Sequence, residues 1–497
     1  MILIRSANII DGSGQPAYKA DVLIKDDKIS AIGNLATKQA EVVIDGLGYN
    51  LAPGFIDVNT DSDHYLSLFT NPQQKDFLIQ GVTTIIGGHC GSSLAPLIYG
   101  SLESIQKWGD INQVNVNWHT VAEFLKILNQ IKLGVNFGTL MGHSTIRRAL
   151  IGEEMRELTE SELKVFKYMI QEGMEDGALG LSTGLSYVHA KSASLDEVQS
   201  LVEVVAKHEG VYTTHLRDDR DHLVMSIKEA IEIARNTKVK VLISHLRPLV
   251  GFEENFKEGL NLLEQAGREL DIHFDGYPFD TSVVPIYTLL PQWAQDGGAE
   301  VMLKNIQSKE KRDRLIKEMV YVAGDLIIAR AKEAPHLKGK TLTEFAEVQG
   351  LGLPEALLKL MELTNLKSVM FYRNISPDMA IDSLLSSSAL VASNGAGLPD
   401  KADILKHERF YNTFPKFLEI AQKSDKISLE AAIKKITLTP ATKFSLAKRG
   451  LVKEGNVADL VMFNKNKIVN VLVNGQLAVR DGQLQETLSG KVLKHRD

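Results

Sequence analysis

The central part of the chain alternates short apolar runs with longer stretches whose apolar residues recur at helical spacing. The apolar runs cover residues 83–86, 135–140, 211–214, 239–244 and 272–275. Two of the intervening stretches, residues 194–208 and 223–236, carry apolar side chains three and four positions apart, which predicts amphipathic helices. Repeated strand–helix units predict an α/β fold with a parallel sheet. The central part is long enough for a closed, TIM-like (β/α)8 barrel.

The two ends of the chain have a different sequence pattern, in which short strand-like segments are joined by tight turns. Asp-Gly turns stand at residues 11–12 near the start and 481–482 near the end. We therefore expect one small β-sandwich domain built from residues 1–53 and 447–497, and two separate terminal domains are the alternative. The remaining expectations are a barrel over residues 54–446 and, within it, a charged helical insertion at about 290–345.

Composition describes an ordinary globular protein and narrows the classes of partner. Of 497 residues, 44% are hydrophobic and 24% are charged, and the formal net charge is −6. A net negative charge argues against nucleic-acid or anionic-membrane partners, because both attract basic surfaces. No apolar run approaches the roughly 20 residues that span a bilayer. Cys90 is the only cysteine, so no disulfide can form within the chain, and we expect a reducing, cytoplasmic compartment.

Three residues with metal-binding side chains stand at the ends of apolar runs. They are Cys90 in Gly-Gly-His-Cys-Gly, His215 in Thr-His-Leu-Arg and His245 in Ser-His-Leu-Arg. A barrel gathers its active-site residues at the ends of its strands, and thiolate and imidazole are both common zinc ligands. Each residue alone has a simpler interpretation, as a small buried cysteine or a hydrogen-bonded histidine. Their shared position makes a zinc site an equal alternative.

Motifs along almost the whole chain point to one family. They include Pro53-Gly54-Phe55-Ile56-Asp57, Gly142-His143-Ser144-Thr145, Leu181-Ser182-Thr183-Gly184, Tyr411-Asn412-Thr413-Phe414-Pro415 and Ala458-Asp459-Leu460-Val461. The first motif marks only the amidohydrolase superfamily. Together with the cysteine context, the histidine pair and the Tyr-x-Thr-Phe-Pro segment, it resembles the D-aminoacylase, or N-acyl-D-amino-acid deacylase, branch.

The resemblance implies a zinc-dependent amidohydrolase that cleaves the acyl amide of an N-acyl amino acid or a peptide-like small molecule. It implies one tightly bound zinc ion on Cys90, His215 and His245, with a fourth position open to water or substrate. It also implies that Tyr187 and Arg247 contact the substrate. Arg247 matches a family lysine and keeps a cation for the substrate carboxylate. The alternative for Arg247 is a surface ion pair.

Three positions depart from the family pattern. The family His-x-His pair, which can bind a second metal, falls on Asn59 and Asp61, and the family aspartate that accepts the proton of water falls on Asn394. An amide has no useful basicity. One hypothesis is that Asp61 is a replacement base. The other is that hydrolysis is lost and the chain binds a ligand or performs another acyl-transfer, cyclisation or lyase reaction.

Four further residues are weaker candidates. Asp63 and His64 lie close to Asp61, and their simpler interpretation is as solvated loop residues. Asp275 either orients a histidine or has another partner. His143 is a further candidate for lining the site. The sequence leaves the oligomeric state open.

Overall fold

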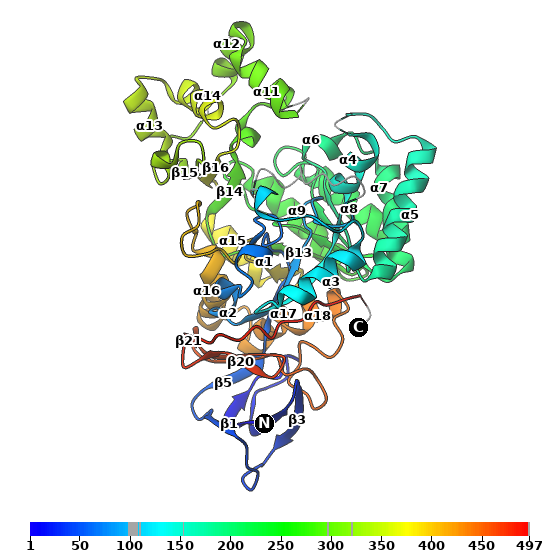
Figure 1. Cartoon of the computed structure of the whole chain (residues 1–497), viewed down its shortest axis with the longest axis vertical. Coiled ribbons are helices and arrows are strands. Elements are labelled where there is room, and N and C mark those ends of the chain that lie inside the picture. The colour runs from blue at the N-terminus through cyan, green and yellow to red at the C-terminus, as the bar shows by residue number, and fades with distance from the viewer. Residues whose placement is uncertain (98–107, 109–110, 153, 296–297, 320–321, 496–497) are drawn as a thin grey trace.

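Parallel strands form the wall of an α/β barrel at the centre of the molecule (Figure 1). The computed structural model describes residues 1–497 except 98–107, 109–110, 153, 296–297, 320–321 and 496–497. The wall strands, in chain order, are β6 (Phe55–Asp57), β7 (Val82–Gly87), β8 (Asn136–Thr139), β9 (Met141–Gly142), β10 (Gly180–Gly184), β11 (Val211–His215), β12 (Lys240–Ile243), β13 (Ile272–Gly276) and β17 (Ala389–Val391). Neighbouring strands pair in parallel, as β6-β7-β8 and β9-β10-β11-β12-β13-β17. A parallel bridge between Thr60 and Gly395 joins the first strand region to the last.

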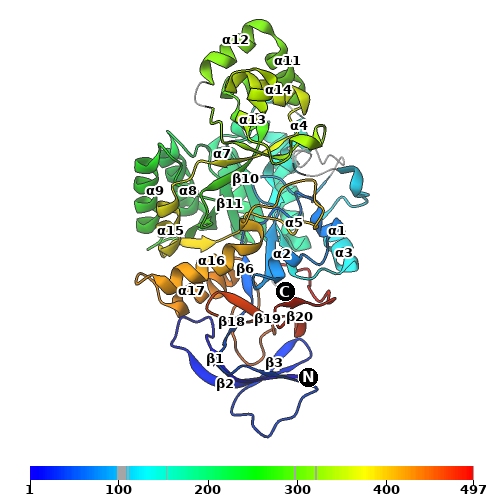
Figure 2. The ribbon, with the colours of Figure 1, turned by 90° about the vertical axis from the view of Figure 1, so that its left-hand side faces the viewer.

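Helices cover the outside of this wall (Figure 2). The longer ones are α3 (Val121–Ile131), α4 (His143–Ile151), α5 (Glu160–Asp176), α7 (Leu195–Lys207), α8 (Leu223–Thr237), α9 (Glu253–Ala266), α15 (Pro377–Leu385), α16 (Arg409–Lys423) and α17 (Leu429–Ile436). The short ones are α1 (Ser67–Thr70), α2 (Lys75–Leu78), α6 (Val188–Lys191) and α18 (Leu438–Lys443). All six residues of β7 are buried, as expected for a parallel strand with helices on one side and the barrel interior on the other. The two helices expected from apolar spacing correspond to α7 and α8.

Strands from both ends of the chain form one sheet below the barrel (Figure 1). They are β1 (Ile2–Ile9), β2 (Tyr18–Lys25), β3 (Lys28–Gly33), β4 (Val42–Asp45), β5 (Asn50–Pro53), β18 (Leu460–Asn464), β19 (Lys467–Val473), β20 (Gln476–Arg480) and β21 (Gln483–Leu484). The antiparallel pairing of β5 with β18 connects the two ends. Strands from the two ends of the chain thus share one sheet.

An excursion between β13 and β17 forms the opposite end of the molecule. Its elements are β14 (Thr281–Pro285), α10 (Gln292–Gln295), α11 (Gly298–Gln307), α12 (Lys309–Glu318), β15 (Ile327–Arg330), α13 (Leu342–Gln349), α14 (Leu353–Leu363) and β16 (Val369–Arg373). The three strands form an antiparallel sheet in the order β14-β16-β15, and the excursion has its own apolar core. The helical insertion expected at about 290–345 thus lies inside a longer unit that begins and ends with paired strands.

Candidate functional site

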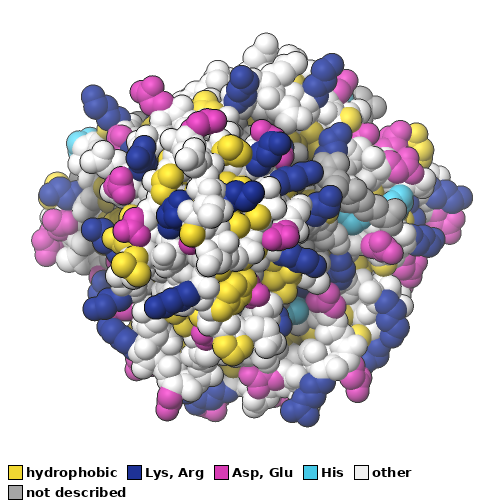
Figure 3. Space-filling view, turned by 90° about the horizontal axis from the view of Figure 1, so that it is seen from below, with side chains coloured by type: hydrophobic (Ala, Val, Ile, Leu, Met, Phe, Trp, Pro, Cys, Tyr) yellow, Lys and Arg dark blue, Asp and Glu magenta, His cyan; other side chains and the backbone are white. Residues whose placement is uncertain are grey.

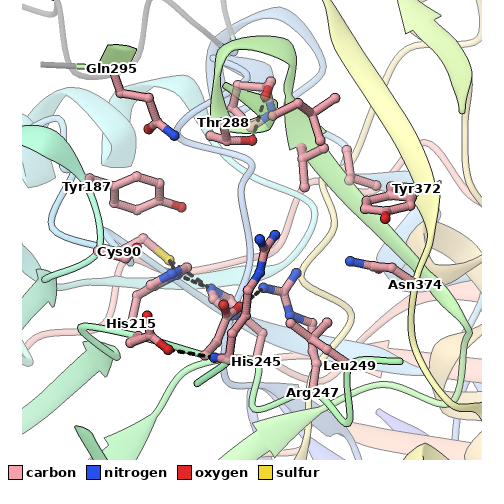
Figure 4. A pocket seen from close by; sticks show the side chains of 18 of the residues that line it. Cys90, Tyr187, His215, His245, Arg247, Leu249, Thr288, Gln295, Tyr372 and Asn374 are labelled. Atoms are coloured by element: carbon pink, nitrogen blue, oxygen red, sulfur yellow. Dashed lines mark hydrogen bonds and ion pairs between the residues drawn. The ribbon is translucent and has the colours of Figure 1, made fainter. Parts of the chain in front are cut away.

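The barrel brings Cys90, His215 and His245 together at the carboxyl ends of its strands. Cys90 follows β7, His215 is the last residue of β11, and His245 follows β12. The Cys90 sulfur lies 3.2 Å from Nε2 of His245 and 4.0 Å from Nδ1 of His215, and the two nitrogens are 3.0 Å apart. Figure 4 shows the three side chains pointing toward one another at the wall of a pocket. The structure thus brings the three predicted ligand residues close enough together to hold one metal ion.

These distances fit a zinc ion. Zn–N bonds of about 2.0–2.1 Å and a Zn–S bond of about 2.3 Å place tetrahedral ligand atoms roughly 3.3–3.6 Å apart. Burial, with smaller effects from the charges of His215 and Arg247, lowers the pKa of His245 well below its ordinary value of 6.5. His245 is therefore held in the neutral form that a metal requires. A thiol and two imidazoles form a donor set that suits zinc.

The local backbone that presents these ligands is unusual. Cys90 and His245 have positive φ angles of 54° and 36°, a region that non-glycine residues seldom occupy. The main-chain N–H of His245 donates to the buried Asp275 carboxylate at 2.8 Å. Before Cys90, Gly88 has a φ of 81°, and a Cβ atom there would lie 2.2 Å from the Leu140 carbonyl oxygen. Only glycine fits this turn.

The residues at the altered family positions lie side by side. Nδ2 of Asn394 is 3.5 Å from Asp61 Oδ2 and 3.4 Å from Asn59 Oδ1, while Asn59 Nδ2 donates to Asp275 at 3.2 Å. Asp61 and Asn394 therefore share one cavity wall, which makes a transfer of the carboxylate from one strand end to the other geometrically sound. Asp275 contacts the main chain of His245 and the Asn59 amide, so its partners are not the histidine rings.

The expectation that Asp63 and His64 are solvated loop residues is wrong. Asp63 is 1% exposed and His64 is 2% exposed. Nδ1 of His64 lies 3.0 Å from Asp61 Oδ1, and the main-chain N–H of Gly88 donates to Asp63 Oδ2 at 2.6 Å. The segment after β6 folds inward because these polar groups find partners at the barrel mouth.

Arg247 and Tyr187 both line the cavity. Arg247 donates to Asp219 Oδ2 at 2.6 Å and to Ser282 Oγ at 3.0 Å. Burial disfavours its charge, but Asp219 outweighs this and raises the pKa of Arg247. The Tyr187 ring packs on His215 with centroids 4.8 Å apart, and burial raises the pKa of Tyr187 well above 10.

Arg409 also lines the cavity, although it does not stand at a strand end, where the sequence pattern would have drawn attention to it. It begins α16, is 2% exposed, and donates to the Asn394 carbonyl at 2.6 Å. Among the described residues, its Nε and Nη1 atoms have no hydrogen-bond partner. A buried guanidinium with open donors is suited to a bidentate anion. The only sequence signal was its place two residues before the Tyr-x-Thr-Phe-Pro motif.

The cavity itself has a volume of about 400 Å³, within the range of small-molecule sites. The lining includes Asp61, His64, Cys90, Tyr187, His215, His245, Arg247, Asn394 and Arg409. His143 is not among the lining residues, and its Nε2 atom pairs with Glu197 at 2.9 Å. The cavity thus combines a metal-ligand set, the Asp61 carboxylate beside the Asn394 amide, and several arginines that include Arg247 and Arg409.

Comparison with known proteins places this arrangement in a family. No protein-family model matches the chain. The chain is 32% identical over 471 residues to D-aminoacylase of Alcaligenes xylosoxydans xylosoxydans, a match that covers 93% of the chain and 88% of the relative. The chain belongs to the D-aminoacylase branch of the amidohydrolases.

Solved structures of D-aminoacylase-branch proteins agree over the whole length. N-acyl-D-glutamate deacylase from Bordetella bronchiseptica, complexed with zinc and a phosphonate mimic of the tetrahedral intermediate, is 25% identical with a TM-score of 0.82. A D-aminoacylase whose binuclear centre shows one-metal activation and second-metal attenuation is 28% identical, also with a TM-score of 0.82. Each match covers 99% of both chains. The chain is a metal-dependent amidohydrolase of the expected barrel fold, and these predictions are confirmed.

Proposed function

We propose that this chain hydrolyses the acyl amide of N-acyl-D-amino acids with one tightly bound zinc ion. The observation that carries the proposal is that one cavity holds Cys90, His215 and His245 beside Asp61, Arg247 and Arg409. A zinc ion held by the three ligands would polarise the amide carbonyl and make water more acidic. The D configuration and the acyl-amide substrate come from the named relatives.

Asp61 is the proposed general base. Its Oδ1 is engaged by His64, which leaves Oδ2 on the side of Asn394 and the cavity. Oδ2 would accept the proton of the attacking water and return it to the leaving nitrogen when the C–N bond breaks. Asn394 would contribute a hydrogen-bond donor, since an amide cannot act as the base.

Arg409 and Arg247 are the proposed contacts of the substrate carboxylate. Arg247 already shares its charge with Asp219, whereas Arg409 donates to a neutral carbonyl and keeps two open donor atoms. We therefore expect Arg409 to supply most of the binding and Arg247 with Tyr187 to complete the pocket. Arg409→Met should weaken binding of an N-acyl amino acid much more than binding of its carboxamide. An equal loss for both ligands would contradict this role.

A small molecule is the expected partner, not a nucleic acid or a membrane. On the β-domain end of the molecule, side chains of both charges are interspersed (Figure 3). Within the described part of the chain, every helix is too short or too polar to cross a bilayer. A lone cysteine that serves as a metal ligand is compatible with the reducing, cytoplasmic location proposed here.

The test is a screen of N-acetyl-D- and N-acetyl-L-amino acids with zinc-loaded protein. We expect turnover of D substrates, and Asp61→Asn should lower kcat by about 100- to 10,000-fold with zinc still bound. Asn394→Asp is the matched variant, because it places a carboxylate at the family position. Absence of turnover in the wild type, with turnover in Asn394→Asp, would show that the native reaction has been lost.

A further inference from the structure

The cavity contains an imidazole enclosed by carboxylates, separate from the Cys90 cluster. His64 lies between Asp61 and Asp63, and all three side chains are nearly inaccessible to solvent. Nδ1 of His64 is 3.0 Å from Asp61 Oδ1, and Nε2 is 3.1 Å from the Ser92 carbonyl oxygen and 3.9 Å from Asp63 Oδ2. Asp63 Oδ1 has no hydrogen-bond partner among the described residues.

This geometry defines the charge of His64. A carbonyl oxygen only accepts hydrogen bonds, so Nε2 carries a proton, and an ionised carboxylate only accepts, so Nδ1 carries one too. The ring is then an imidazolium. Burial acts against this charge, but the carboxylates of Asp63 and Asp61 outweigh burial and raise the pKa of His64 to about 9.

We propose that the His64 imidazolium takes the place of a second metal ion beside Asp61, so that the chain binds one zinc ion even when zinc is abundant. A histidine can bind a metal only through a nitrogen that has lost its proton. Both His64 nitrogens are engaged by oxygen atoms, and a divalent ion next to the imidazolium would meet a like charge. Asn59, which stands at the other position of the altered His-x-His pair, donates a hydrogen bond from its amide to Asp275.

The same contact makes His64 a positioning residue. By holding Oδ1 of Asp61, the imidazolium fixes Oδ2 toward Asn394 and the cavity. This second consequence rests on the proposed function, because it matters only if Asp61 moves a proton. The metal count does not rest on that function, since it can be measured without substrate.

The experiment is equilibrium dialysis against excess zinc, followed by elemental analysis. Wild-type protein should hold about one zinc per chain, the number that its one complete ligand set can bind. His64→Gln should hold about two, because Asp61 and Asp63 then lack an internal cation and attract a metal. His143→Gln is the matched control, since it removes a buried histidine paired with Glu197 outside the cavity. It should stay at about one.

Two zinc ions in the wild type, or one in folded His64→Gln, would overturn the proposal. If circular dichroism shows that His64→Gln does not fold, His64→Asn replaces it with the same expected gain. In the activity arm, His64→Gln should lower kcat about 10- to 100-fold with KM little changed, as for residues that orient a site. Absence of acyl-amide turnover would refute the proposed function. The zinc count would still test whether His64 takes the place of a second metal ion.

Discussion

At the scale of single residues, three side chains of the cavity stand on strained backbone. Cys90, His245 and Asn394 all have positive φ angles, at 54°, 36° and 45°. Each such residue costs on the order of 1–3 kcal/mol and persists only where its surroundings enforce it. For His245 the enforcing contact is the Asp275 carboxylate. Metal binding at Cys90 and His245 should therefore be linked to folding.

Removal of the metal tests this linkage. Cys90→Ala should lose most of its tightly bound zinc and unfold at a lower temperature. A metal that binds only the folded state at about 100 times its Kd adds roughly 2.7 kcal/mol of stability. Thermal unfolding with and without a chelator measures the difference. The chelator should affect the wild type and leave Cys90→Ala unchanged, and full zinc content in the variant would contradict the ligand assignment.

Asp57 gives a prediction about pH. Burial raises its pKa from 3.8 to about 7, although main-chain N–H groups of Ser393 and Asn59 favour the charged form. The folded state thus holds a proton that the unfolded state releases, so this contribution to stability is complete below about pH 4 and is lost as the pH rises through about 7.

Asp57→Asn should flatten that pH dependence. The measurement is the difference in urea-unfolding free energy between wild type and variant at pH 5 and pH 8. The variant should gain stability relative to the wild type at the higher pH. A difference that does not change with pH would show that Asp57 is ionised in the folded protein.

The sequence predicts the place of a residue in the fold where that place follows from the local pattern of apolar residues. Cys90 and His215 stand at strand ends, and barrel geometry brings strand ends together. His64 was misjudged because a polar loop residue carries no local sign of burial. Arg409 was missed because it reaches the cavity from the first turn of a helix.

Among elements, the turn between β7 and Cys90 is tightly constrained. Gly88→Ala should reduce zinc content and stability together, because its Cβ would meet the Leu140 carbonyl oxygen. Gly48→Ala is a matched control with a φ of 82° and no atom within 4 Å of the added Cβ. The control should cost only about 1–2 kcal/mol of conformational strain. Equal zinc loss in both variants, by elemental analysis, would show that the turn is not specific.

The insertion shows which secondary-structure elements local sequence cannot predict. Its helices carry local apolar spacing, so a helical insertion was foreseeable from the sequence. The pairing of β14 with β16 joins segments more than eighty residues apart, Thr281 with Arg373. Such pairing depends on contacts that no local window contains, and β propensity depends strongly on that context.

For the whole molecule, a buried ionic network joins the β-domain to the barrel. Asp459 pairs with Arg449 and accepts hydrogen bonds from Asn136 Nδ2 of β8 at 2.9 Å and from the Asn474 main chain at 2.7 Å. Asp459 is 6% exposed. Removing it would leave the Arg449 charge buried without its partner, which is a costly change.

Asp459→Ala should therefore lower the unfolding free energy by about 3–5 kcal/mol. Asp481→Ala, which removes an exposed partner of Arg480, is the control and should cost about 0–1 kcal/mol. Chemical denaturation measures both. If the two variants lose equal stability, the network does not hold the two parts together.

The shared terminal sheet has a consequence for synthesis on the ribosome. β5 is made early, but its partner β18 begins at Leu460. At about 5–20 residues per second, translation leaves the apolar edge of β5 without β18 for roughly 20–80 s. During that interval the nascent chain exposes a strand edge that invites pairing with other chains. We expect the yield of folded protein in cells to depend on translation speed and chaperone supply, and not only on the stability of the finished protein.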